Sequence, residues 1–536
     1  MSDFEFVRIA LRAGAFASWM VSQSVLAQSM DNMQMAPPDK QQQTSKQKTT
    51  QPQPEQKQEE MKMPGMSEQG TEPNAKSPEL KPEQPAQKKP EPGKPEEKKP
   101  DEKMQHEMPM PETHDHQAMK AQGPDMQMPG DGDMHMVPES FIAAIEHHGT
   151  SGTSAEPNST PIPMFMKMRG KWMFMFHGAA WINMEQQSSP RGYDKVFSTN
   201  WFMPMAQRKI GDQGTLTLRT MLSLEPATVT GRQYPLLFQI GETADNKVIV
   251  DGQHPHDFFM ELAALYDHRV GRNTLLSFYF APMGDPAMGP TAYPHRASAS
   301  ENPMATLGHH FQDSTHIAAD VITVGLTHKI FRIEASGFHG REPDEQRWNL
   351  NSGKIDSWSS RLTVNPAQNW SFQYSFANLV SPEGQHPAED LRRMTSSLMY
   401  NRPFHEGNFA GTVLWGRNQT PEGEVFNGYL AEGTLQFARR NYAWTRFEMD
   451  DRTNELVLGK NTPVNLQEHF IGRVKAFTLG YDREFAVIPH VATAFGGQVS
   501  VYGTPERVQA IYGAHPAGVV LFVRFRPAVQ REKMKM

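Results

Sequence analysis

The sequence predicts an all-β protein: a transmembrane, antiparallel, up-and-down β-barrel of about 16 strands that follows a disordered N-terminal segment. Three observations predict it. Of the 30 Phe, 9 Trp and 12 Tyr residues, only four precede Phe141, and the last of these is Trp19. From Lys171 onward, short segments alternate apolar with polar residues. The links between those segments alternate between short and long, as they do in outer-membrane barrels.

Residues 1–27 are expected to be a secretory signal peptide. Arg8 and Arg12 flank a moderately apolar run, and the small residue Ala27 precedes the expected cleavage site. No later apolar stretch is long enough to predict a transmembrane helix. The chain contains no Cys, which excludes disulfides and thiolate metal sites. The formal net charge of −7 gives no reason to expect nucleic acid as a partner.

Residues 28–103 are predicted to be a disordered linker. They consist largely of Pro, Lys, Glu, Gln, Ser and Met, and such a composition cannot bury enough apolar surface to offset the entropy lost on ordering. Alternation of Pro with charged residues favours extended polyproline II structure, which suits a tether that crosses a periplasm. Two alternatives stay open: a solubilising tail with no need for reach, and a tether that touches peptidoglycan in a structural envelope protein.

Residues 104–140 are predicted to bind metal. A thioether sulfur selects Cu(I) or Ag(I), whereas imidazole suits Cu(II) and zinc. The donors recur at a spacing of two residues, which places them on one side of an extended chain. The alternative is that Met is only a neutral filler of a low-complexity segment. The candidate ligands are Met104, His106, Met108, Met110, His114, His116, Met119, Met126, Met128, Met134, His135 and Met136.

Residues 141–170 are interpreted as a connector, 171–527 as the barrel and 528–536 as a C-terminal tail. Within the barrel, the segment "NWSFQYSFANL" places Trp370, Phe372 and other aromatic residues on one face and small polar residues on the other. An aromatic outer face is what lipid contact at the membrane interfaces requires. The predicted strands are 171–184, 196–206, 214–224, 257–266, 274–281, 319–328, 330–338, 356–365, 369–379, 392–401, 408–416, 427–438, 441–450, 472–485, 488–502 and 516–526.

An even number of strands places both ends of the barrel on the side of the short turns, which is periplasmic in outer-membrane barrels. The Met/His-rich segment would then lie in the periplasm. On the opposite side, the long loops carry His and carboxylate residues that form either a metal site or a network that braces loops and lines a pore. These loop candidates are His254, His256, Asp257, His309, His310 and His316. Ser314, with Asp313 and His316, has no fixed geometry, so no enzymatic activity is expected.

The layout resembles that of copper-resistance protein B type outer-membrane proteins. The resemblance is carried by "MDNMQM", "MPGDGDMHM" and the strands after residue 171. The barrel stretches "DGQHPHDFFMELA", "HHFQDSTHI" and "HGREPDE" are similar to bacterial outer-membrane proteins with no established activity. The resemblance implies copper handling in the outer membrane of a Gram-negative-type bacterium, and it supplies no catalytic residues. The long Pro/Lys/Glu tether departs from it.

The sequence therefore predicts a barrel in outer-membrane lipid whose periplasmic tail binds Cu(I), or silver, and acts in copper homeostasis or resistance. Periplasmic copper proteins are expected partners, besides the metal ions themselves. The alternative is a passive porin whose tail is only a spacer.

Overall fold

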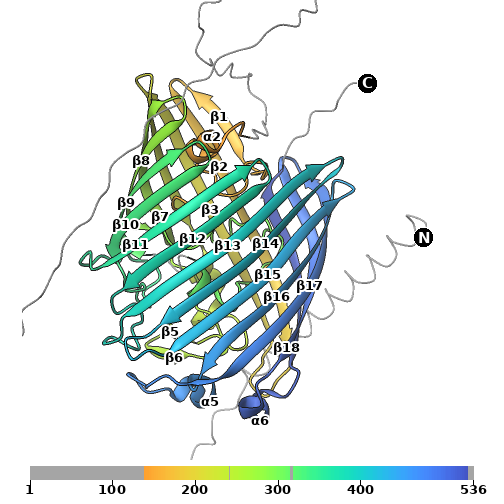
Figure 1. The fold of residues 1–536 in the computed structure, drawn as a ribbon. Coiled ribbons are helices and arrows are strands. Elements are labelled where there is room, and N and C mark those ends of the chain that lie inside the picture. Colours follow the sequence, from red (N-terminus) through yellow and green to blue (C-terminus); the bar gives the residue numbers. More distant parts are fainter. Residues whose placement is uncertain (1–137, 241, 314–317, 529–536) are drawn as a thin grey trace, which may run out of the picture. The chain divides into compact units, whose positions relative to one another are not determined.

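A computed structural model describes residues 138–240, 242–313 and 318–528. These residues form one closed antiparallel β-barrel of 16 strands, in which each strand pairs with the next along the chain and β19 pairs with β2 to complete the ring (Figure 1). The barrel strands are β2 (Trp172–Gln187), β3 (Lys195–Ile210), β4 (Gly214–Leu222), β7 (Phe259–Gly271), β8 (Thr274–Gly284), β9 (Ala318–His328), β10 (Phe331–His339), β11 (Ser357–Ala367), β12 (Trp370–Leu379), β13 (Leu391–Phe404), β14 (Gly407–Gln419), β15 (Val425–Phe437), β16 (Asn441–Thr453), β17 (Phe470–Ile488), β18 (Val491–Gly503) and β19 (Ala517–Pro527).

Short helices and strands precede the barrel or lie within its long loops. None of the helices among the described residues is long and apolar enough to cross a membrane. The short strands are β1 (Phe165–Arg169), which forms a hairpin with β2, and the β5 (Glu242–Ala244) and β6 (Lys247–Ile249) hairpin. The helices are α2 (Phe141–His147), α3 (Glu225–Thr228), η1 (Thr230–Arg232), α4 (His309–Gln312), α5 (Glu455–Leu458), η2 (Gly459–Asn461), η3 (Glu506–Val508) and α6 (Gln509–Tyr512).

The predicted fold class is confirmed, and the structure has a strand at each of the 16 predicted positions. The differences lie at the ends: β3 continues to Ile210 and β17 to Ile488, a few residues beyond the predicted limits. Tight turns explain the extra length, since the chain reverses in only a few residues after each of these strands. His490, for example, adopts a positive φ of 62° between β17 and β18.

The alternation of side chains along each strand separates an apolar outer surface from a polar interior. On β12 the rings of Trp370, Phe372 and Tyr374 are exposed, whereas the intervening Ser371 and Gln373 are buried inside. The same alternation runs around the barrel, where Leu and Val residues point outward and Thr, Ser, Arg and Glu residues point inward. The aromatic face predicted from the sequence is therefore the outer face.

All short turns lie at one end of the barrel and all long loops at the other. Two residues connect β7 to β8, whereas residues 223–258 connect β4 to β7. The barrel begins at Trp172 and ends at Pro527, both at the short-turn end. In Figure 1 the short turns are at the top, and the loop elements β5, β6, α5 and α6 are at the bottom.

Candidate metal centre in a filled barrel

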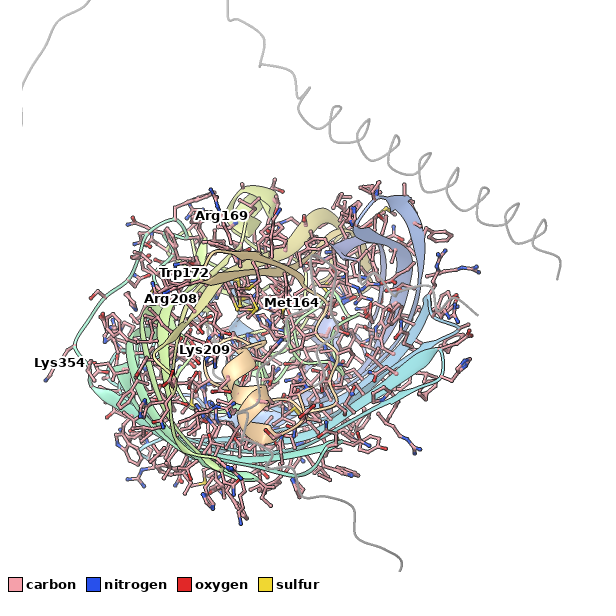
Figure 2. All side chains as sticks on the ribbon, turned by 90° about the horizontal axis from the view of Figure 1, so that it is seen from above. Met164, Arg169, Trp172, Arg208, Lys209 and Lys354 are labelled. Atoms are coloured by element: carbon pink, nitrogen blue, oxygen red, sulfur yellow. The ribbon has the colours of Figure 1, made fainter. Side chains whose placement is uncertain are left out.

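Residues 138–164, which precede β1, fold inside the barrel at its short-turn end. Figure 2, which looks into this end, shows α2 surrounded by the strands. The segment lacks a sheet of its own, so inward-facing side chains satisfy its backbone. Arg219, which is buried on β4, donates to the carbonyl oxygens of His148, Thr150 and Gly152 and forms a salt bridge of 2.7 Å with Glu261.

The opposite wall of the barrel holds the same segment. Asn365 on β11 donates to the carbonyl oxygen of Glu156, and Asn401 on β13 donates to that of Ser159. Arg361 donates to the hydroxyl of Thr153. The residues interpreted as a connector thus include a segment that bridges opposite walls of the lumen. We call residues 138–164 the plug segment.

The loop between β8 and β9 also enters the lumen, and buried ion pairs hold it there. Arg296 donates through Nε to Glu432 Oε1 at 2.7 Å, and Arg446 donates through Nε to Oε2 of the same carboxylate at 2.8 Å. Ser298 donates to Glu432 at 2.8 Å. We call residues 285–313 the inward loop. Paired charges therefore brace this loop against the barrel wall.

Plug segment and inward loop leave small cavities. Four cavities among the described residues have volumes of about 50, 40, 20 and 20 Å³. A cavity of this kind has room for a few waters or an ion, since one water needs about 10–15 Å³ measured in the same way.

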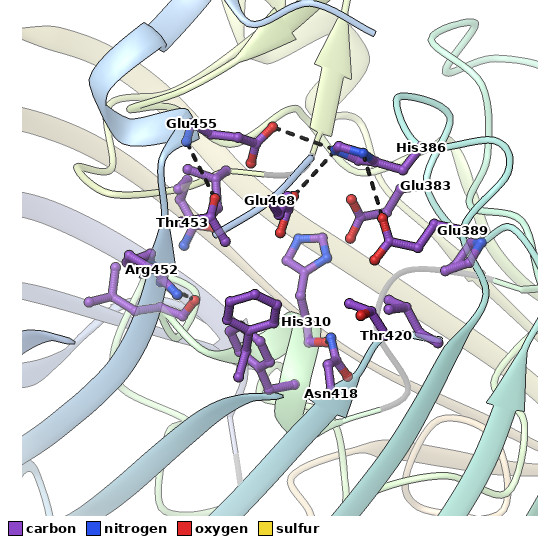
Figure 3. A pocket seen from close by; sticks show the side chains of 17 residues that line it. His310, Glu383, His386, Glu389, Asn418, Thr420, Arg452, Thr453, Glu455 and Glu468 are labelled. Carbon is purple, nitrogen blue, oxygen red and sulfur yellow. Dashed lines mark hydrogen bonds and ion pairs between the residues drawn. The ribbon is translucent and has the colours of Figure 1, made fainter. Parts of the chain in front are cut away.

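The largest of these four cavities lies toward the long-loop end and carries a cluster of carboxylates around one histidine (Figure 3). The loop between β12 and β13 supplies Glu383, His386 and Glu389, and the loop between β16 and β17 supplies Glu455 and Glu468. We call these five residues the His386 cluster. Two separate loops therefore meet over one buried imidazole.

Ligand-type atoms of Glu383, His386 and Glu468 all lie within 4.8 Å of one another. His386 Nε2 is 3.3 Å from Glu468 and 3.8 Å from Glu455, and its Nδ1 is 3.8 Å from Glu389. Glu455 is fully buried, and its carboxylate contacts His386 and the carboxyl group of Glu468. Several buried carboxylates around one imidazole are costly unless a cation or a proton accompanies them.

The cluster holds more acids than bases, and this excess changes how its members titrate. Burial, followed by the charge of Glu342, raises the pKa of Glu383 to about 8. Burial and the neighbouring carboxylates raise the pKa of Glu468 well above its ordinary value. Burial opposes the charge on His386, but its contacts with Glu455 and Glu383 raise its pKa overall. Carboxylates of this kind take up protons, or they share a divalent cation.

The donor set decides which cation suits the site. Carboxylate oxygens with one imidazole favour ions such as Mn²⁺ or Zn²⁺, whereas Cu(I) and Ag(I) prefer sulfur. The His386 cluster is therefore a candidate centre for a divalent cation, distinct in chemistry from the predicted Met/His segment.

In the structure, the loop residues that were predicted as metal ligands each contact a different partner. Nδ1 of His256 lies 2.9 Å from Glu225, and Asp257 forms a salt bridge of 3.3 Å with Arg347. His254 Nδ1 contacts the carbonyl oxygen of Pro255.

Two of the remaining loop candidates, His309 and His310, belong to the inward loop. The ring centres of His309 and His310 lie 4.2 Å apart. Nδ1 of His309 contacts the carbonyl oxygen of Thr306. Nδ1 of His310 lies 3.3 Å from the carboxylate of Glu342. Of the predicted loop residues, His310 lines the same cavity as the His386 cluster. His316 and the predicted Ser314 arrangement lie outside the described residues, as do all twelve predicted ligands of the Met/His segment.

Sequence reasoning missed the His386 cluster. A local signal was present in "PEGQHPAED", where Glu383, His386 and Glu389 follow one another at intervals of three residues. The decisive partners, Glu455 and Glu468, come from a loop about 70 residues further along the chain, and only the closed barrel brings them close.

Comparisons with known proteins find similar barrels among solved structures. An anion-selective porin from Comamonas acidovorans is 10% identical, with a TM-score of 0.43, over 66% of this chain and 99% of the porin. OmpF of Salmonella typhi, in complex with daunomycin, is 9% identical, with a TM-score of 0.42, over 67% of this chain and all of that one. OprB of Pseudomonas putida is 7% identical, with a TM-score of 0.42, over 66% and 94%. No model of a known protein family and no curated protein matches the chain. The resemblance to the copper-resistance protein B type stays a prediction.

Proposed function

We propose that this protein is an outer-membrane barrel whose N-terminal Met/His-rich segment binds Cu(I) or Ag(I) in the periplasm and acts in copper homeostasis or resistance. The observation that carries the proposal is the position of the barrel's two ends. Trp172 and Pro527 both lie at the short-turn end, which faces the periplasm in outer-membrane barrels. The Met/His segment precedes the barrel in the sequence, and we propose that it lies on that side of the membrane.

The outer surface supports insertion into a bilayer. Exposed rings stand next to the short turns, among them Trp370 and Phe404, and Trp358 stands near the long loops. Trp358 lies opposite Asn378 on β12, eight residues from Trp370. At about 3.4 Å per residue and a tilt of about 40°, this corresponds to about 21 Å along the barrel axis. The exposed Phe, Leu and Val residues between these rings complete an apolar band close to the roughly 25 Å expected of such proteins.

A passive porin is the alternative function. It requires a continuous aqueous path, which the plug segment and the inward loop obstruct. The carbonyl oxygens of the plug segment accept hydrogen bonds from Arg219 on the barrel wall. The buried ion pair of Arg296 with Glu432 holds the inward loop. The filled lumen favours handling of an ion over free diffusion of solutes.

The proposal is tested with a variant in which the twelve predicted ligands in residues 104–136 are replaced, Met by Leu and His by Gln. The six methionines nearer the N-terminus are also replaced by Leu, namely Met30, Met33, Met35, Met61, Met63 and Met66. We call it the tail-silent variant. A matched control keeps the composition of this segment but scrambles its order. Because a flexible segment gathers ligands without a preformed site, the scrambled chain is expected to preserve copper tolerance and the tail-silent chain to lose it. Equal growth of the tail-silent strain and the wild type in copper contradicts the proposal.

A direct measurement complements the growth assay. X-ray absorption of a peptide spanning residues 104–136, loaded with Cu(I), is expected to show sulfur in the first coordination shell. A shell of nitrogen and oxygen alone contradicts thioether binding.

A further inference from the structure

One wall of the lumen is unusually rich in methionine. A buried cluster on and around β2, β3 and β4 contains eight methionines, whereas the interior of a wide barrel is ordinarily polar. These methionines are Met164, Met175, Met203, Met205, Met221, Met260, Met283 and Met304. Met164, on the chain that leads to β1, lies inside the ring of strands (Figure 2).

Strand register places three possible soft-metal ligands in one row. On β2 and β3, His177 lies directly opposite Met203. The register of β3 and β4 pairs Phe202 with Leu222, which sets Met221 opposite Met203 on its other side. Side chains that face one another across neighbouring strands have Cβ atoms about 5 Å apart. His177, Met203 and Met221 are all buried on the inner face.

The inward loop adds a fourth ligand to this row. Nε2 of His295 lies 3.3 Å from the sulfur of Met221. Its ring centre is 5.3 Å from that of His177 and 4.3 Å from that of Trp201, which also packs edge-on against His177. Two imidazoles and two thioethers thus converge from three strands and a loop.

One imidazole of the row has a ring nitrogen that no protein group in the described part of the chain satisfies. Nε2 of His177 is buried and makes no hydrogen bond among the described residues. A buried nitrogen without a partner is costly for the fold, so it needs an explanation such as an ion.

We propose that His177, Met203, Met221 and His295 form a binding site for a soft monovalent cation, Cu(I) or Ag(I), within the lumen. Thioether sulfur and neutral imidazole are ligands for such ions, and the set contains no carboxylate that would favour a harder cation. The inference deepens the proposed function, on which it rests for the identity of the ion.

A second pair of thioethers extends the site toward the periplasmic end. Met175 and Met205 lie opposite one another on β2 and β3, two residues nearer the short turns than His177 and Met203. Both are buried on the inner face. An ion released by the N-terminal segment would meet this pair before it reaches the row of four.

Packing alone is the competing explanation for the methionines. Met fills irregular space well, and the plug segment needs an apolar surface to pack against. Packing, however, does not explain why Nε2 of His295 faces the sulfur of Met221. Nor does it explain why Nε2 of His177 is buried without a hydrogen-bond partner among the described residues. Replacing Met by Leu separates the two explanations, because Leu preserves volume and removes the sulfur.

The experiment measures silver bound to the full-length tail-silent variant, folded in detergent and desalted after exposure to silver nitrate. Mass spectrometry of the eluted metal is expected to find one Ag(I) per chain. Adding Met203→Leu and Met221→Leu is expected to abolish this binding. The matched control, Met399→Leu, removes a buried methionine from β13 in a different part of the wall and is expected to bind silver as before. Folding of each variant is checked by its heat-dependent mobility in SDS gels.

Three results overturn the site: no silver on the tail-silent chain, unchanged silver on the double Leu variant, or equal loss in the Met399→Leu control. X-ray absorption of the silver-loaded tail-silent chain provides a test that needs no lumenal substitution. It is expected to show nitrogen and sulfur around the ion, and a shell of oxygen alone overturns the proposal. Failure of the proposed function is distinguishable, since it appears as normal copper tolerance in the tail-silent strain whatever the lumen binds.

Discussion

Replacing Glu432 by Gln tests how the inward loop is held. The carboxylate accepts from Arg296, Arg446 and Ser298, at distances of 2.7 to 2.8 Å. The Glu432 and Arg296 side chains are at most 1% exposed and that of Arg446 is 3% exposed, so the substitution leaves two buried guanidinium groups without their shared counterion. Removing one partner of a buried ion pair costs about 3–5 kcal/mol.

The free energy of unfolding, measured by urea titration of the barrel in lipid vesicles, is expected to fall by about that amount. Glu406→Gln is the matched control, because it removes the same charge from a solvent-exposed pair with Arg439. Exposed pairs contribute less than about 1 kcal/mol, so this variant is expected to unfold almost as the wild type does. A loss in Glu432→Gln no larger than that in the control would refute the claim that the pair anchors the loop.

Three further predictions concern the plug segment and the His386 cluster. Arg219→Met leaves Glu261 buried without its counterion and frees the carbonyls of the plug segment; faster proteolysis of residues 138–164 and a larger planar-bilayer conductance are expected, and unchanged values of both contradict the bridging role. The pKa of Glu383 rises on folding from 4.5 to about 8, so its stabilising contribution is complete below pH 4.5 and is lost as the pH rises toward 8. Glu383→Gln is expected to flatten the urea stability profile over that range, and an unaltered profile contradicts the shift. Glu468→Gln is expected to weaken Zn²⁺ binding measured by calorimetry in the tail-silent variant, and equal affinity contradicts the site.

The strands could be predicted because alternate residues of each strand face different surroundings. One set of side chains lies on the apolar outer face, and the other set faces the lumen. Trp370, Phe372 and Tyr374 on β12 are exposed on the outer face, and the residues between them face a packed polar interior. A period of two therefore marks every strand. The turn at Lys329, which adopts a positive φ of 52°, and the other short links were also readable, since so few residues can only reverse the chain.

The contents of the lumen could not be predicted in the same way. The plug segment contains Thr150, Gly152, Ser159 and similar small polar residues, and these are also the residues of an ordinary surface loop. They lie inside because Arg219 and Asn401 on different strands satisfy their backbone groups. The sequence of the plug segment itself gives no indication that Arg219 and Asn401 will be its hydrogen-bond partners.

The candidate sites show the same limit. His386 and Glu468 are far apart in the sequence and meet through two loops, so spacing alone could not join them. Met203 and Met221 each lie on a predicted strand, but their alignment with His177 depends on the register of three strands. The N-terminal ligand set, by contrast, follows from composition alone and stays a prediction.

The most direct test of the account asks on which side of the outer membrane each end of the barrel lies. The chain has no Cys, so single cysteines can be placed at Lys354, which is exposed in a long loop, and at Ala121 in the Met/His segment. Intact cells are treated with a maleimide that does not cross the outer membrane. The account predicts labelling of Lys354→Cys in intact cells and of Ala121→Cys only after the outer membrane is permeabilised. Labelling of Ala121→Cys on intact cells would contradict it.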